Sequence, residues 1–130
     1  MSMGKSATPL ARVRGLGSAG HGGGHWIEER FYSVALFLLS LWLLFSLMML
    51  PALDRETMVE WLRDPAGAVP MALFVIVSFK HALDGMKVFV DDYVHDAGNL
   101  VATHFALKLA AIAGAALSLF ALAKIAFGAA

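Results

Sequence analysis

The chain has 130 residues, of which 59% are hydrophobic and 15% charged, and its mean hydropathy is +0.71. Soluble domains are about 45–50% apolar and about 25% charged, so this composition predicts a membrane protein. The formal net charge is zero and no Lys/Arg stripe with interleaved aromatic residues occurs, which excludes a nucleic-acid-binding protein. Cysteine is absent, which excludes disulfides, thiolate metal sites and cysteine-ligated iron–sulfur clusters.

Residues 1–25 are rich in Gly, Ser and Ala and predict an extended N-terminal arm ahead of a membrane part at residues 26–130. The arm has no apolar run long enough for a signal-peptide core. We interpret it as a flexible tail, with a strand lying along a partner protein as the alternative. His21 and His25 flank three glycines and have no third ligand nearby, so we expect solvated loop residues there.

The first predicted span covers residues 31–53, a stretch without a charged residue. Its length meets the roughly 20 residues that a helix needs to cross a bilayer. Trp26 to Tyr32 mixes aromatic and charged residues directly before it, as is typical of a membrane interface. Pro51 lies near its end, where a kink or a stop is tolerated.

A connector follows the first span at residues 54–64, where acids and arginines alternate with apolar residues. Met58, Trp61 and Leu62 are spaced as on one face of a helix, which predicts a short amphipathic helix on the membrane surface. Residues 64–67, Asp-Pro-Ala-Gly, predict a break.

The second predicted span covers residues 69–91. The uncharged part, residues 66–79, is too short to cross alone, so we expect the helix to continue through charged residues to about Asp91. Four charged residues of alternating sign are spaced four, three and four apart: Lys80, Asp84, Lys87 and Asp91. That spacing predicts a ladder on one helix face whose members neutralise one another and snorkel.

The third predicted span covers residues 100–128, after a turn at Gly98-Asn99. His104 and Lys108 lie near its start, and we interpret them as a polar cap at the interface. Small residues recur at every fourth position, which predicts close packing on another helix. These are Ala106, Ala110, Gly114 and Ser118. The fold class is therefore all-α with three transmembrane helices.

The distribution of Lys and Arg predicts the orientation. The N-terminal side carries Lys5, Arg12, Arg14 and Arg30, whereas the first loop has only two arginines and the C-terminal end only Lys124. The N-terminus and the loop at residues 91–99 are therefore expected on the cytoplasmic or matrix side, and the C-terminus on the opposite side.

The polar residues of the second span are candidate functional groups, because ionisable groups inside a membrane are costly. His81 is followed one turn later by Gly85, and Asp92, eleven residues on, returns to the same helix face. A small residue beside a histidine leaves room for a flat macrocycle, so His81 is either a haem ligand or a hydrogen-bonded packing residue. Asp92 and Tyr93 are either a quinone-reading pair or a solvated acid and an interfacial tyrosine.

The residues His81-Ala82-x-x-Gly85-Met86, followed by Asp92-Tyr93, resemble the smaller hydrophobic anchor subunit of succinate dehydrogenase, respiratory complex II. In that family a histidine of the second span is followed, eleven residues later, by a tyrosine preceded by aspartate. Residues 12–18 and Arg30 also resemble alphaproteobacterial members. With the span count and length, the resemblance covers essentially the whole chain.

The resemblance implies one part of a heteromeric anchor bundle in a bacterial inner membrane. The partners would be a flavoprotein with FAD, an iron–sulfur subunit and a second, cytochrome b-type anchor subunit. His81 would supply one axial ligand to the iron of a b-type haem shared with that second anchor. Tyr93 would donate its phenolic hydrogen to a ubiquinone carbonyl, and Asp92 would orient nearby groups or help to deliver protons. Electrons from the clusters would reduce ubiquinone, while succinate is oxidised elsewhere, so no catalytic residue is assigned here.

Helix geometry agrees with a second haem ligand from outside this chain. Counted from the shared loop, His81 lies about ten residues into its span and His104 about five, a depth mismatch of roughly 7 Å at about 1.5 Å per residue. Two alternative functions stay open: a cofactor-free assembly subunit, and a small transporter that uses Lys80, Asp84 and Lys87 as an ion relay. The absence of internal repeats argues against the transporter.

Overall fold

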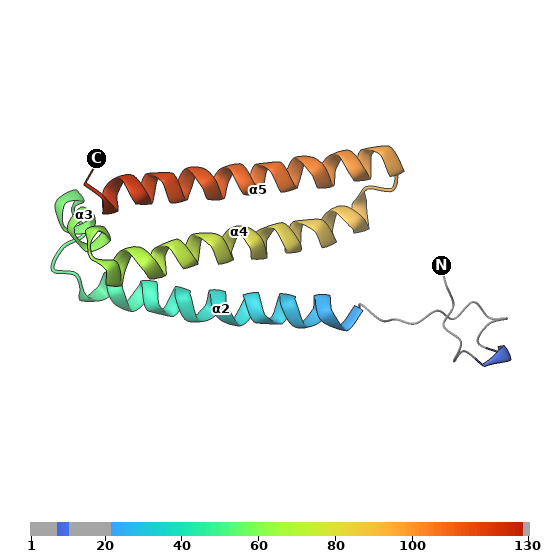
Figure 1. The fold of residues 1–130 in the computed structure, drawn as a ribbon, viewed down its shortest axis with the longest axis horizontal. Coiled ribbons are helices and arrows are strands. Elements are labelled where there is room, and N and C mark those ends of the chain that lie inside the picture. Colours follow the sequence, from blue (N-terminus) through green and yellow to red (C-terminus); the bar gives the residue numbers. More distant parts are fainter. Residues whose placement is uncertain (1–7, 11–21, 129–130) are drawn as a thin grey trace.

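The structure is a computed structural model that describes residues 8–10 and 22–128. Within these residues it contains no strand, and its principal helices are α2 (Gly22–Met49), α3 (Arg55–Arg63), α4 (Pro65–Tyr93) and α5 (Ala97–Ala126) (Figure 1). The all-α prediction is confirmed. Most of the predicted arm, including His21, lies outside the described residues. Gly22 to Gly24, which we expected in the arm, form the first turn of α2, where the backbone N–H groups have no intrahelical partner in any case.

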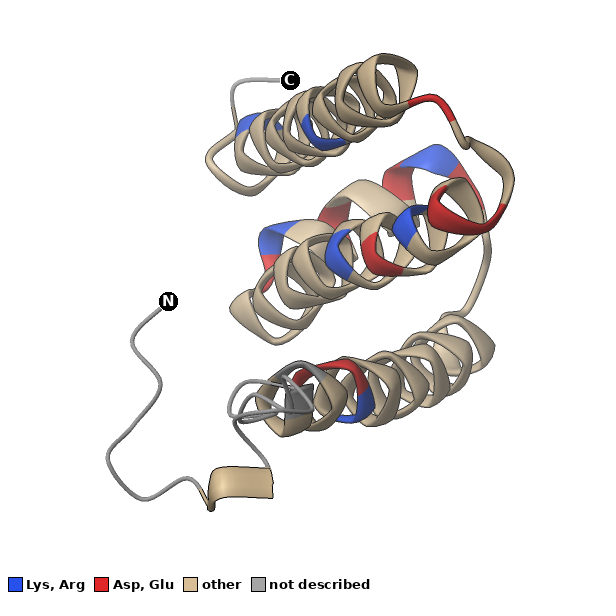
Figure 2. Cartoon of the chain, turned by 90° about the vertical axis from the view of Figure 1, so that its right-hand side faces the viewer, with Lys and Arg blue, Asp and Glu red and all other residues tan. Residues whose placement is uncertain are grey.

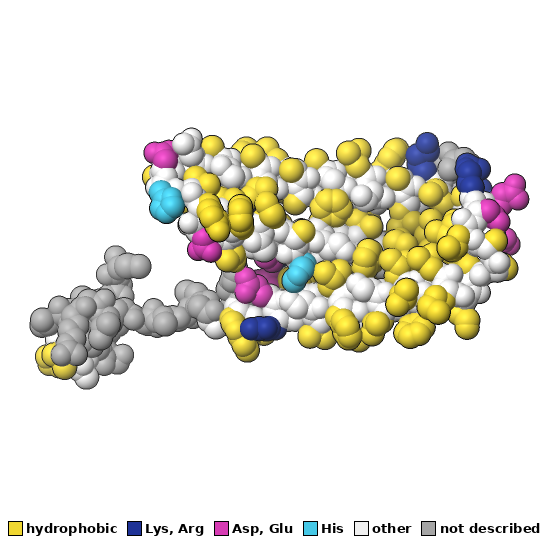
Figure 3. All heavy atoms as spheres, turned by 180° about the vertical axis from the view of Figure 1, so that it is seen from behind, with side chains coloured by type: hydrophobic (Ala, Val, Ile, Leu, Met, Phe, Trp, Pro, Cys, Tyr) yellow, Lys and Arg dark blue, Asp and Glu magenta, His cyan; other side chains and the backbone are white. Residues whose placement is uncertain are grey.

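The three long helices form a layer one helix thick. The middle helix, α4, packs against α2 on one side and α5 on the other, and α2 and α5 do not touch (Figures 1 and 2). A layer one helix thick buries few side chains. The buried apolar residues among those described are Val77, Val90 and Leu122, and Asp84 is the buried charged one. Large apolar side chains therefore cover the middle of the surface (Figure 3), where lipid or partner subunits would cover them at no hydrophobic cost.

Three helices are long and apolar enough to cross a membrane: Trp26–Met49, Pro65–Tyr93 and Ala97–Ala126. The three predicted spans are thus confirmed, but their boundaries shift by a few residues. The first helix ends at Met49, just before Pro51, which lacks the N–H needed to continue it. The third begins at Ala97, because the Asp96 side chain accepts a hydrogen bond from the backbone of Asn99 and caps the helix there.

The short connector helix α3 is present as predicted, and one residue joins it to α4. The backbone N–H of Asp64 donates to Glu60 at the end of α3, and its side chain accepts from Ala66 at the start of α4. The predicted break at residues 64–67 is therefore wrong beyond Asp64. Pro65 is the first residue of α4, a position where its fixed φ suits a helix and its missing N–H is not needed.

Gly67 lets α4 pass directly beneath α3. It is buried, and a Cβ atom at this position would run into the backbone oxygen of Trp61. The indole of Trp61 also stacks on that of Trp42 in α2, with ring centroids 5.7 Å apart. The N-terminus of α3 is capped by Asp54, whose carboxylate accepts a 2.9 Å hydrogen bond from the backbone of Thr57. That backbone hydrogen bond lowers the pKa of Asp54 below its ordinary value.

The predicted small-residue stripe packs against α4 only in part. Gly114 faces Phe79 closely, and Ser118 is half-buried and donates a 2.8 Å hydrogen bond to the Gly114 carbonyl. Ala106 and Ala110 are exposed, so the described helices of this chain do not cover them. At about 100° per residue, a four-residue repeat drifts about 40° per step around the helix, which carries the stripe out of the α4 interface.

Candidate functional site

The charged half of α4 begins inside the membrane. The helix has 29 residues and is therefore about 43 Å long, against about 30 Å of hydrocarbon. At most about 13 Å can protrude at one end, yet the part from Lys80 to Tyr93 is about 21 Å long. Lys80 and His81 therefore lie inside the hydrocarbon, and Asp84, about 13 Å from the end of the helix, lies at its edge. Figure 2 shows the alternating positive and negative residues along α4.

The charged residues of this turn form a network that reaches α2. Lys80 pairs with Asp84 on its own helix, and its Nζ lies 3.0 Å from Oε1 of Glu28 on α2. Lys87 Nζ lies 3.4 Å from the other carboxylate oxygen of Asp84. Lys80 Nζ also sits 4.6 Å from the centroid of the Tyr32 ring, a cation–π contact.

The predicted ladder is therefore correct in its mutual neutralisation and wrong in its exposure. Asp84 is only 6% exposed, because it lies where α4 is covered by its neighbours and by the two lysine side chains. The fourth member leaves the ladder altogether. Asp91 Oδ1 lies 2.7 Å from Nε2 of His104 on α5. His104 is thus an interhelical partner of α4, a contact that its interpretation as an interfacial polar cap did not include.

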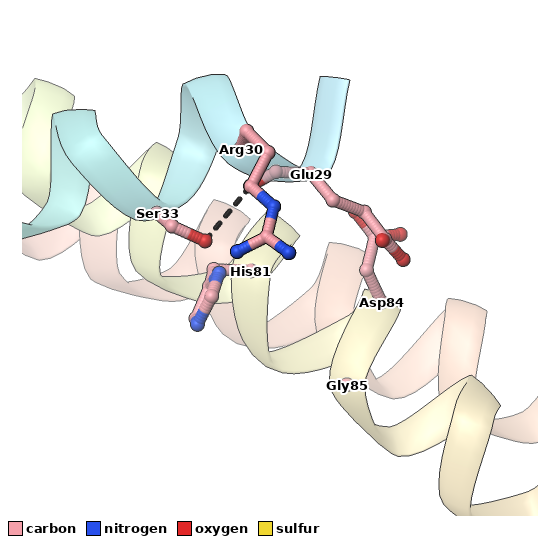
Figure 4. A pocket seen from close by; sticks show the side chains of 6 residues that line it. All are labelled: Glu29, Arg30, Ser33, His81, Asp84 and Gly85. Atoms are coloured by element: carbon pink, nitrogen blue, oxygen red, sulfur yellow. Dashed lines mark hydrogen bonds between the residues drawn. The ribbon is translucent and has the colours of Figure 1, made fainter. Parts of the chain in front are cut away.

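His81 lies on the open side of α4 and shares a cavity with α2. Its side chain is exposed, and neither ring nitrogen has a hydrogen-bond partner among the described residues. Within the described residues, His81 is therefore not a hydrogen-bonded packing residue. The cavity has a volume of about 270 Å³ (Figure 4). It is lined by Glu29, Arg30, Ser33, His81, Asp84 and Gly85.

The predicted neighbourhood of His81 and Gly85 is present, because both line this cavity. A Cβ atom at Gly85 would meet nothing within 4 Å, so the space beside the imidazole is open. This opening is on the surface of the chain, so His81 is accessible from outside it.

Sequence reasoning missed the contribution of α2 to this cavity. Figure 4 shows Arg30 and Ser33 extending from α2 toward His81 on α4. The Ser33 hydroxyl donates a 2.8 Å hydrogen bond to the Glu29 carbonyl one turn earlier. The i, i+1, i+4 spacing of Glu29, Arg30 and Ser33 places them on one helix face and was the available signal.

Asp92 and Tyr93 lie at the far end of α4 from this cavity. Tyr93 is 69% exposed, and its ring stacks on Phe89 with centroids 4.5 Å apart. Asp92 is exposed, and neither side chain has a hydrogen-bond partner among the described residues. Twelve residues of helix place Tyr93 about 18 Å along the axis from His81. The His81 cavity and the Asp92–Tyr93 end of α4 are therefore two separate regions of the structure.

Comparison with known proteins identifies the family. The model of the succinate dehydrogenase/fumarate reductase transmembrane subunit family matches residues 4–123. The chain belongs to this family. A succinate dehydrogenase hydrophobic membrane anchor subunit from Paracoccus denitrificans is 32% identical over 94% of both chains. Subunits of the same name from Rickettsia bellii and Rickettsia conorii are 33% and 30% identical, over 65% of this chain and 68% of theirs. No solved structure matches.

The resemblance drawn from His81, Gly85 and the Asp92–Tyr93 pair is thus confirmed at the level of the family. The chain is a multi-pass membrane anchor subunit of a bacterial succinate dehydrogenase, and as an anchor it belongs to a complex with other subunits.

Proposed function

We propose that this anchor subunit helps to bind a b-type haem and ubiquinone, and that it forms the end of the electron path from the iron–sulfur subunit to quinone. The observation that carries the proposal is His81: an exposed imidazole at hydrocarbon depth, with no hydrogen-bond partner among the described residues and open space beside it. A side chain of this kind is costly in a membrane unless it serves a ligand or a partner.

The residues around His81 fit a haem. A neutral imidazole ligates iron without burying a charge. Gly85 leaves the adjacent surface free for a flat ring system, and the guanidinium of Arg30 lines the same cavity, where it could pair with a haem carboxylate. When bound, the haem supplies a one-electron redox centre. A further protein ligand would come from the second anchor subunit, because His104, the other histidine considered for this role, is held by Asp91.

Tyr93 and Asp92 support a quinone site at the end of α4. The phenol is exposed and has no hydrogen-bond partner among the described residues, and its ring is held by the stack on Phe89. Ubiquinone as substrate needs a hydrogen-bond donor at the membrane boundary and protons from the aqueous side. Tyr93 would donate to a carbonyl, and Asp92 beside it would orient groups or hand on protons.

The soluble flavoprotein and iron–sulfur subunits would dock at the end where α2 begins and α4 turns into α5. These two segments lie at the same end of the bundle, opposite α3 (Figure 1). The excess of Lys and Arg before the first span favours the cytoplasm for this end, with the C-terminus in the periplasm.

A reduced-minus-oxidised optical spectrum of the purified native complex tests the haem assignment. His81→Ala should abolish the b-type signal. His104→Ala is the matched control, because it removes the histidine of the neighbouring helix α5, and it should keep the signal. A signal that survives His81→Ala unchanged would contradict the ligand assignment.

Steady-state kinetics test the quinone assignment. Tyr93→Phe and Asp92→Asn should lower kcat/KM for ubiquinone and leave succinate oxidation by an artificial acceptor unchanged. Tyr32→Phe is the matched control, because Tyr32 is the only other tyrosine of the chain. If neither His81 nor Tyr93 matters, the chain is a cofactor-free assembly subunit.

A further inference from the structure

Asp84 is a buried carboxylate near the edge of the hydrocarbon, held between two lysines and lining the His81 cavity. We propose that Asp84 and Lys80 are positioning residues that fix the electrostatic field at this cavity and thereby set the reduction potential of the haem bound there. This inference rests on the proposed function of His81 as a haem ligand.

The charges are close to the ligand. Asp84 lies one helical turn from His81, and both side chains line the same cavity of about 270 Å³. Lys80 is the direct neighbour of His81 in sequence and pairs with Asp84. Glu28 on α2 pairs with the same lysine at 3.0 Å. Single charge-removing substitutions in this set therefore change the charge beside His81 by one unit.

The same network fixes the cavity walls. Lys80 joins α4 to α2 through Glu28 and through the face of the Tyr32 ring. Because α2 also supplies Arg30 and Ser33, the ion pairs hold these side chains in register with His81.

Helix packing alone does not explain these residues. Buried ion pairs contribute little net stability compared with apolar residues of similar volume, and the small-residue contact at Gly114 shows that this chain packs helices without them. A fixed charge beside a redox centre has a different effect, because negative charge disfavours the reduced state and positive charge favours it. At a separation of about 10 Å and an effective dielectric constant of about 20, one unit charge changes the reduced-to-oxidised ratio roughly tenfold. For a one-electron couple, tenfold is about 59 mV.

The test is a potentiometric titration of the b-type signal in the native complex. Asp84→Asn should raise the midpoint potential, and Lys80→Met should lower it. The double variant, in which the two changes of charge cancel, should return close to the wild-type value. Lys124→Met is the matched control, because it removes a lysine near the opposite end of the bundle, in the last turn of α5, and it should leave the potential unchanged.

Shifts of opposite sign that cancel in the double variant would support the proposal, because loosening of the structure does not produce opposite signs. Shifts of the same sign, or none, would overturn it. If a variant fails to assemble, Lys87→Met takes its place: Lys87 is partly exposed, contacts Asp84 at 3.4 Å and should lower the potential by less. Unchanged potentials in a complex whose signal depends on His81 reject this inference alone, whereas a signal independent of His81 rejects the proposed function with it.

Discussion

Substitution of Gly114 by alanine tests how closely α5 packs on α4. A Cβ atom at residue 114 would lie 2.5 Å from Cε1 and 2.8 Å from Cζ of Phe79. Ordinary carbon–carbon contacts begin near 3.5 Å, so the ring or the helix must move by about 1 Å. Overpacking of this kind costs about 1–3 kcal/mol. Alanine also favours the helix by up to about 1 kcal/mol over glycine, which offsets part of that cost.

A double-mutant cycle with Phe79→Leu separates the two effects, because the helix preference is the same in both backgrounds and cancels. We expect a coupling of about 1–3 kcal/mol between residues 79 and 114. The assay is amide hydrogen exchange of α4 and α5 in the native complex in nanodiscs. Gly114→Ala should speed exchange relative to its effect in the Phe79→Leu background, by about fivefold per kcal/mol. Equal effects in the two backgrounds would refute the reasoning, since the helices would then not meet through this contact.

Three further predictions concern a helix cap, a turn and a pair of side chains between two helices. Hydrogen bonds from Thr57 lower the pKa of Asp54, so the Asp54 carboxylate should stabilise α3 fully above its ordinary pKa and lose this effect as the pH falls through the lowered pKa. Amide hydrogen exchange of α3, normalised to the unstructured rate at each pH, should show this pH dependence in the wild-type protein. The Asp54→Ala variant should not show it. Gly67→Val should destabilise the α3–α4 turn by about 1–3 kcal/mol or more, seen as a lower dissociation temperature of the complex, whereas Gly23→Val, where nothing lies within 4 Å, should not. The Asp91–His104 pair is partly exposed, so a double-mutant cycle on unfolding should give a coupling of at most about 1 kcal/mol; a much larger value would contradict the exposure of the pair.

The number of spans was predictable because hydrocarbon thickness alone sets the length of an apolar helix. Helix ends were less predictable, since they depend on single side chains: Asp64 and Asp96 each start a helix a few residues before its apolar run. The break expected at Pro65 illustrates this. The same residue can end one helix or begin the next, and only the Asp64 cap decides between the two.

Contacts within one helix followed from spacing, and contacts between helices did not. The pairing of Lys80, Asp84 and Lys87 was visible in their positions along α4. The contacts of Lys80 with Glu28 and of Asp91 with His104 depend on how neighbouring helices are placed and rotated, which no sequence period encodes. For the same reason the sequence singled out His81 from its own motif, whereas the α2 side of its cavity was missed.

The central claim is that the imidazole of His81 ligates iron, and chemical rescue tests it most directly. His81→Gly removes the ligand and leaves a space beside Gly85 that is already open. The account predicts that the purified complex loses its b-type spectrum and regains it when imidazole is added, which separates ligation from any structural role of the side chain. A spectrum that persists without imidazole, or an assembled complex that imidazole does not restore, would contradict the claim.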